Sequence, residues 1–158
     1  MAHFPVNHPA RPLYRVFAGL VGVYILVFGV WGVIVTWGEP LFDRGSHWAL
    51  GLRTNLAFSL ASVIFGIVLI VGASRRGNLG HFMNLAAGVV SMVTGIAMMS
   101  VLQTRANFLN FSMSTVIVSL LFGLLLLATG LYDKIGTDEH AEREKADRLH
   151  PARGAGAH

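Results

Sequence analysis

The sequence predicts an all-α protein built as a four-helix transmembrane bundle. Four long apolar stretches contain no Asp, Glu, Lys, Arg or His, so all 12 Lys and Arg and all 8 Asp and Glu lie elsewhere in the 158-residue chain. A helix needs roughly 20 apolar residues to cross the hydrocarbon core of a bilayer, and each stretch is close to that length. This separation of charged from apolar residues excludes a soluble globular domain and a disordered chain.

The expected spans cover residues 16–37, 56–73, 82–102 and 112–132. Backbone polar groups in lipid must be satisfied within the spanning structure, which leaves helices or a closed barrel. Barrel strands alternate polar and apolar residues over about 10 residues, whereas these runs do not alternate. We therefore expect a transmembrane domain at residues 16–132, with tails at 1–15 and 133–158.

Positive charge predicts how the bundle is oriented. Nine of the 12 Lys and Arg residues lie in the two tails and in the loop between the second and third spans, which share one side of the membrane. Lys and Arg near helix ends favour the cytoplasmic side, so we expect both termini in the cytoplasm. The net charge of +4 is then mostly a topology signal, and we expect no nucleic-acid partner.

Small residues form a stripe on each expected span. The stripes contain Gly22 and Gly29, Ser62 and Gly66, Gly88, Ser91 and Gly95, and Ser119 and Gly123. Because lipid tails are as apolar as leucine, membrane helices associate through close packing at such residues. We expect these stripes to pack the helices within one molecule, and contacts between two copies are the alternative.

The two halves of the chain also resemble each other weakly. Gly22 and Gly29 correspond to Gly88 and Gly95 at one offset, and Ser62 and Gly66 correspond to Ser119 and Gly123 at another. This predicts two repeated helical hairpins, related by an axis along the membrane normal. The alternative is that Gly and Ser are simply common in membrane helices.

The densest polar cluster lies in the two loops opposite the termini. It includes Glu39, Asp43, Arg53, Asn55, Arg105, Asn107 and Asn110. One interpretation is a structural cap that ties the two hairpins together. The other is a site for a ligand or a partner, because loops often carry function.

Several kinds of chemistry are not expected. The spans lack the intramembrane ionisable residues that proton relays and carriers of charged substrates use. The chain has no Cys, and no two of its His residues have the spacing that places two metal ligands on one helix face. We therefore expect no catalytic residues, no metal and no cofactor.

Two segments resemble a known family. Residues 106–119 and the pattern Asn78-Leu-Gly-His-x-Met-Asn84 are similar to a family of small four-span integral membrane proteins of unknown function, common in actinobacteria. The resemblance covers about residues 15–132. It implies four helices and a bacterial plasma membrane, and it supplies no catalytic residues.

The sequence as a whole favours a non-enzymatic membrane protein that packs against other membrane components. Its expected partners are membrane lipid and either other membrane subunits or a second copy of the chain. The alternative is a small channel or transporter for neutral or apolar solutes, lined by the Ser, Thr and Asn side chains of the stripes.

Overall fold

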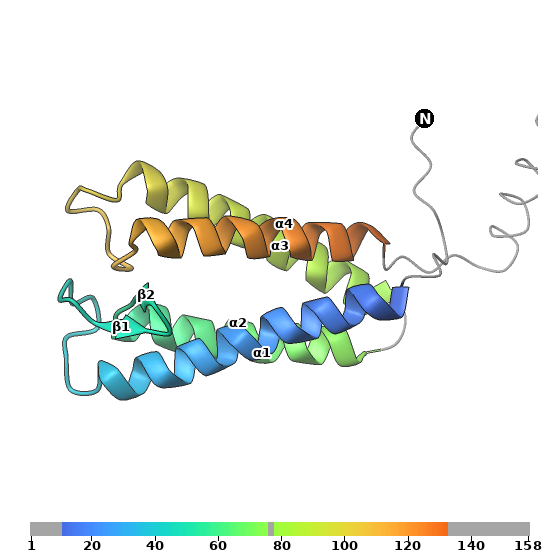
Figure 1. The fold of residues 1–158 in the computed structure, drawn as a ribbon, viewed down its shortest axis with the longest axis horizontal. Helices are drawn as coiled ribbons and strands as arrows, with labels where there is room; N and C mark the ends of the chain where they lie inside the picture. Colours follow the sequence, from blue (N-terminus) through green and yellow to red (C-terminus); the bar gives the residue numbers. More distant parts are fainter. Residues whose placement is uncertain (1–10, 76–77, 133–158) are drawn as a thin grey trace, which may run out of the picture.

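The computed structural model describes residues 11–75 and 78–132, and this part of the chain forms an up-and-down bundle of four helices (Figure 1). The helices are α1 (Arg11–Val35), α2 (Leu56–Ser74), α3 (Asn78–Ser100) and α4 (Met113–Tyr132). All four are long and apolar enough to cross a membrane. The predicted four-helix bundle is therefore confirmed.

The first helix begins earlier than the apolar pattern suggests. It starts at Arg11, so the charged residue Arg15 lies within the helix. The Arg15 guanidinium donates to the carbonyls of Ala73 (2.7 Å) and Arg75 (2.5 Å) at the end of α2. The other residues of the expected tails, 1–10 and 133–158, lie outside the described residues.

The closest helix contacts lie within two hairpins, α1 with α2 and α3 with α4. A Cβ added at Gly66 would lie 2.7 Å from the backbone nitrogen of Leu26 and 2.9 Å from the carbonyl oxygen of Gly22. Only glycine allows two helix backbones to approach this closely. Gly29 makes a similar approach, because a Cβ there would lie 2.6 Å from the backbone nitrogen of Val63.

The second hairpin repeats this seam at equivalent positions. A Cβ at Gly123 would lie 3.0 Å from the backbone nitrogen of Met92 and 3.1 Å from the carbonyl oxygen of Gly88. Gly88 and Met92 correspond to Gly22 and Leu26 at the offset seen in the sequence. A Cβ at Gly95 would likewise meet Leu120 at 2.9 Å. The two hairpins therefore make equivalent glycine contacts, as the predicted repeat expects, and each of these glycines contacts the facing helix of its own hairpin.

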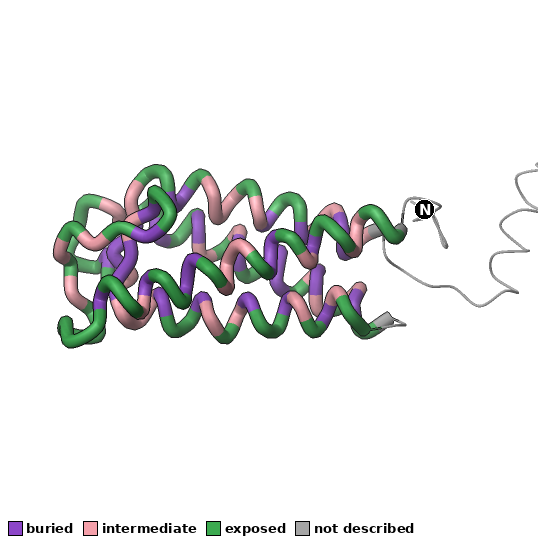
Figure 2. Tube along the Cα trace, turned by 60° about the horizontal axis from the view of Figure 1, so that its bottom comes forward, coloured by how far each residue is buried: buried purple, intermediate pink, exposed green. Residues whose placement is uncertain are grey.

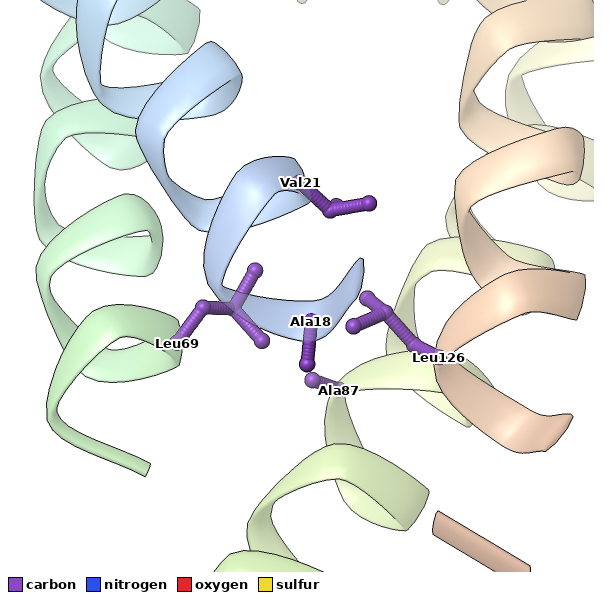
Figure 3. Packing of buried hydrophobic residues seen from close by; sticks show 5 residues of the cluster. All are labelled: Ala18, Val21, Leu69, Ala87 and Leu126. Carbon is purple, nitrogen blue, oxygen red and sulfur yellow. The ribbon is translucent and has the colours of Figure 1, made fainter. Parts of the chain in front are cut away.

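Apolar residues join the two hairpins near the chain ends. Ala18, Val21, Leu69, Ala87 and Leu126 form a buried cluster to which all four helices contribute (Figure 3). Most residues on the outer faces of the helices are exposed, and buried positions face inward (Figure 2). An apolar outer surface of this kind is the one that a lipid environment accommodates.

A short β-ribbon in the first loop was not predicted. Strands β1 (Trp48–Ala49) and β2 (Leu52–Arg53) pair antiparallel, with Trp48 opposite Arg53 and Ala49 opposite Leu52. The turn between them has positive φ at Leu50 (48°) and Gly51 (80°), which is the conformation of a tight two-residue hairpin. The ribbon folds the loop back over the helix ends.

Candidate functional site

The two loops at residues 36–55 and 101–112 cover one end of the bundle, and we call them the loop cap (Figure 1). All seven polar residues singled out in the sequence lie here. The opposite end, where the chain enters α1 and leaves α4, is called the terminal end.

Asn55 is the centre of the loop cap. Its side chain is completely buried and uses all its hydrogen-bonding groups. Its Oδ1 accepts from the backbone N–H of Phe58 (2.9 Å), which caps the N-terminus of α2. Its Nδ2 donates to the carbonyls of Asp43 (3.3 Å) and Phe108 (2.7 Å). One amide therefore starts a helix and joins the first loop to the second.

Asn110 makes the reciprocal connection from the second loop. Its Nδ2 donates to the carbonyls of Gly45 (2.8 Å) and Thr54 (2.9 Å) in the first loop. Its backbone has φ of 56°, a left-handed conformation that Asn adopts more readily than most residues. The buried Asn107 instead folds its own loop, because it donates to Leu102 and Phe111 and accepts from the N–H of Phe111.

Arginine side chains reinforce the cap from its surface. Arg53 donates to the carbonyls of Arg44 (3.2 Å) and Gly45 (3.1 Å). Arg44 donates across the loops to the carbonyl of Thr104 (2.9 Å). Arg105 is exposed, and within the described residues its side chain makes none of the hydrogen bonds of this network. The structure therefore brings together most of the predicted cluster and leaves Arg105 outside it.

Glu39 and Asp43 of the predicted cluster form a group with His47, which the sequence analysis did not include. Their potential ligand atoms lie within 4.8 Å of one another. The regular four-residue spacing of these three residues was the available signal. Asp43 Oδ2 accepts from the N–H of Gly45 (2.7 Å) and bonds His47 Nε2 (3.0 Å). The Gly45 N–H, with a smaller contribution from His47, lowers the pKa of Asp43.

These three residues offer two carboxylates and one imidazole, which are ligand types that a divalent cation accepts. Glu39 is exposed and the other two are half-buried. The Arg53 guanidinium bonds the carbonyl of Gly45, so a positive charge already lies beside the loop that carries Asp43. The bonds that Asp43 makes to Gly45 and His47 both use its Oδ2.

The outer surface of the loop cap carries a group of exposed apolar side chains. Its large exposed side chains are Trp37, Leu41, Phe42, Trp48, Leu50 and Phe108. Phe42 from the first loop and Phe108 from the second pack edge to face, with ring centroids 6.1 Å apart, and each is about half exposed. The cap thus turns many of its polar groups inward and presents aromatic and aliphatic side chains outward.

Beneath the cap, a cavity of about 270 Å³ lies between the two hairpins. Its wall comes from all four helices together with Leu52, Leu109 and Phe111 of the loops. The cavity ends toward the terminal end at the cluster of Figure 3, against which its wall residues Ile25, Phe65 and Phe122 pack. In the described part of the chain, this apolar cluster separates the cavity from the terminal end.

The three predicted serines line this cavity, and two of them also connect the helices of the second hairpin. Ser62, Ser91 and Ser119 all line it. The Ser62 hydroxyl donates to the carbonyl of Phe58 (2.7 Å) on its own helix, and the Ser119 hydroxyl donates to the carbonyl of Ser91 (3.0 Å). The serines therefore face the space between the hairpins, and the bond from Ser119 to Ser91 also links α4 to α3 beside the contact of Gly95.

Asn84 is a buried polar residue that, unlike the Asn residues of the cap, is not held by side-chain hydrogen bonds to other described residues. It lies on α3, is completely buried, and neither its Oδ1 nor its Nδ2 has a hydrogen-bond partner among the described residues. Ala18 occupies the corresponding position of the first hairpin. An unpaired buried amide costs free energy, so Asn84 is a destabilising exception within the bundle.

A family model described as Domain of unknown function (DUF4383) matches residues 15–132. This match takes in nearly all of the four helices and the whole loop cap. No curated protein and no solved structure matches the chain.

Proposed function

The chain belongs to the family described as Domain of unknown function (DUF4383), and we propose that it is a non-enzymatic accessory protein that binds another membrane polypeptide through its loop cap. One observation carries this proposal. The buried Asn side chains of the cap hold its two loops together, whereas Phe42 and Phe108 are exposed as a pair on its surface. Exposed aromatic residues are typical anchors of protein interfaces.

The cap directs its buried amides inward and leaves large apolar side chains exposed. A catalytic centre needs polar groups directed at a substrate, but the amides of Asn55, Asn107 and Asn110 are directed at backbone carbonyls of their own loops. A rigid apolar surface at the end of a bundle loses little conformational entropy when it is covered. These features support binding of a partner protein through apolar contacts.

Site-specific photocrosslinking tests this proposal. The photoreactive phenylalanine analogue p-benzoylphenylalanine replaces Phe42 or Phe108 in the full chain, expressed in its native membrane. The control position is Ile117, which is about half exposed on α4 and lies outside the cap. We expect a protein adduct of one defined mass at positions 42 and 108 and none at 117. Adducts to lipid alone at all three positions would show that the cap rests in the membrane interface and would overturn the proposal.

The proposed setting is a bacterial plasma membrane with both termini in the cytoplasm. The excess of Lys and Arg in the tails and in the loop between α2 and α3 supports this orientation. The chain contains no Cys, so single cysteines can be introduced without background. A membrane-impermeant thiol reagent applied to intact cells should label a cysteine at Ser46 and not one at Ala141. The reverse pattern would contradict the proposed orientation.

A further inference from the structure

The cavity between the hairpins is open on one side and closed on the other, because the two hairpins differ where they face each other. Tyr24 on α1 corresponds to Val90 on α3, and Phe122 on α4 corresponds to Phe65 on α2. Tyr24 and Phe122 pack edge to face with ring centroids 5.3 Å apart and close the side between α1 and α4. The equivalent side, between α2 and α3, has valine in place of the tyrosine.

A second difference widens the same side. Val118 on α4 packs against the buried cluster around Phe28, whereas its counterpart on α2, Ala61, is exposed although it lines the cavity. Val90 also lines the cavity and is 53% exposed. Residues that are both exposed and part of the wall mark the mouth of a cavity. The mouth therefore lies between α2 and α3, on the outer surface of the transmembrane bundle.

The chemistry of the wall selects an apolar occupant. The described wall residues include no charged side chain and include five phenylalanines. The hydroxyls of Ser62, Ser119 and Thr115 donate to backbone carbonyls at 2.7, 3.0 and 3.4 Å. A ligand that required these three donors would have to break existing bonds. The other wall hydroxyls, those of Tyr24, Ser91 and Thr94, are few beside the apolar side chains of the wall.

The size and position of the cavity indicate which apolar molecule reaches it. An apolar cavity of about 150 Å³ holds one benzene molecule, so a cavity of about 270 Å³ has room for roughly ten carbon atoms by the same scale. A mouth between two membrane-spanning helices opens toward lipid tails. The group present there at the highest concentration is the hydrocarbon chain of a bilayer lipid.

We propose that the mouth between α2 and α3 admits one hydrocarbon chain of a bilayer phospholipid into the cavity between the hairpins. The chain enters sideways past Ala61 and Val90, and the headgroup stays outside the bundle. The contact between Tyr24 and Phe122 keeps the opposite side closed. This binding site is independent of the partner surface on the loop cap.

The test uses the full chain in detergent-free lipid nanodiscs that contain phosphatidylcholine with a diazirine near the end of one acyl chain. After photoactivation, mass spectrometry of peptides locates the adducts. In the wild type we expect adducts on interior wall residues such as Phe28 and Phe111, besides those on lipid-facing positions. Labelling confined to lipid-facing positions would overturn the proposal.

Two variants close the mouth, each with a neighbouring control. Val90→Tyr places at the mouth the residue that closes the opposite side, and Val89→Tyr adds the same ring one position away, where the side chain is about half exposed and is not part of the wall. We expect Val90→Tyr to reduce interior labelling by about tenfold, which corresponds to 1.4 kcal/mol. Val89→Tyr should label as the wild type does.

If Val90→Tyr fails to fold, Ala61→Phe closes the mouth from α2, with Leu60→Phe as its control at an exposed position. Interior labelling that is unchanged in a folded mouth-closing variant would refute entry between α2 and α3. A parallel experiment uses a free fatty acid that carries the same diazirine. Interior labelling by the free acid, without labelling by phosphatidylcholine, would refute a phospholipid as the source of the chain.

Discussion

Replacing Gly66 by alanine tests the close approach that holds the first hairpin together. The added Cβ would lie 2.7 and 2.8 Å from the backbone nitrogen and Cα of Leu26, and 2.9 Å from the carbonyl oxygen of Gly22. All three are backbone atoms, so no rotation of a side chain relieves the contact. The two helices must separate by several tenths of an ångström along this part of the seam.

The expected loss of stability follows from two opposing contributions. Forcing an extra methyl group into a packed interior costs about 1–3 kcal/mol, and the immobile backbone at this position favours the upper part of that range. Replacing glycine by alanine within a helix regains up to about 1 kcal/mol. We therefore expect Gly66→Ala to destabilise the protein by about 1–2 kcal/mol, which lowers Tm by roughly 2–8 °C for a chain of this length.

Thermal unfolding in mild detergent, followed by tryptophan fluorescence, measures this change. Gly19→Ala on α1 is the matched control, because its added Cβ would come no nearer than 3.8 Å to Ala73. The control should unfold at the wild-type temperature or slightly above it. The proposed seam would be refuted if Gly66→Ala and Gly19→Ala unfolded at the same temperature.

Four further substitutions have clear expected outcomes in the same unfolding assay. Asn84→Leu removes a buried amide that has no partner among the described residues and should raise Tm through a gain of about 1–3 kcal/mol; a lower Tm would show that the amide is satisfied. Asn110→Ala removes two hydrogen bonds between the loops and places alanine at a φ of 56°, so it should lower the free energy of unfolding by about 3 kcal/mol. Its control is Arg105→Ala at an exposed position, which should change the free energy of unfolding by less than about 0.5 kcal/mol. The Gly45 N–H is the main cause of the lowered pKa of Asp43 in the folded protein. The ionised Asp43 carboxylate therefore stabilises the fold fully above pH 3.8, and this stabilisation is lost as the pH falls through the lower folded-state pKa. Asp43→Asn should therefore flatten the fall of Tm in acid, and an unchanged acid profile would contradict this cause.

The helices could be predicted from the sequence because a bilayer imposes one length and one composition on every span. The expected boundaries differ most from the structure for α1 and α3, which begin five and four residues before the expected start and end two residues before the expected end. Arg15 can lie on α1 because carbonyls at the end of α2 accept its guanidinium, and no count of apolar residues contains that contact. The repeated hairpins could be predicted from glycine positions, since close helix contacts restrict these positions to the smallest residue.

The candidate sites were less accessible to sequence reasoning. The polar residues of the loops could be recognised as a cluster, but the hydrogen bonds that make Asn110 structural and leave Arg105 exposed depend on how two distant loops meet. The ring contact between Phe42 and Phe108 on the outside of the cap depends on the same arrangement of the two loops. The cavity arises from side-chain volumes on four helices, so no single stretch of sequence contains a signal for it.

The separate glycine seams have a consequence for how this protein is made. Each seam lies between helices that are consecutive in the chain, so the first hairpin can close during synthesis, before the ribosome has produced the second. Phe108 and Asn110 are made only after α3, and their bonds to the first loop satisfy the Asn55 amide and the Thr54 carbonyl. The loop cap therefore cannot close around the first hairpin alone, and a chain that stops before the second loop would leave these groups of the first loop unpaired.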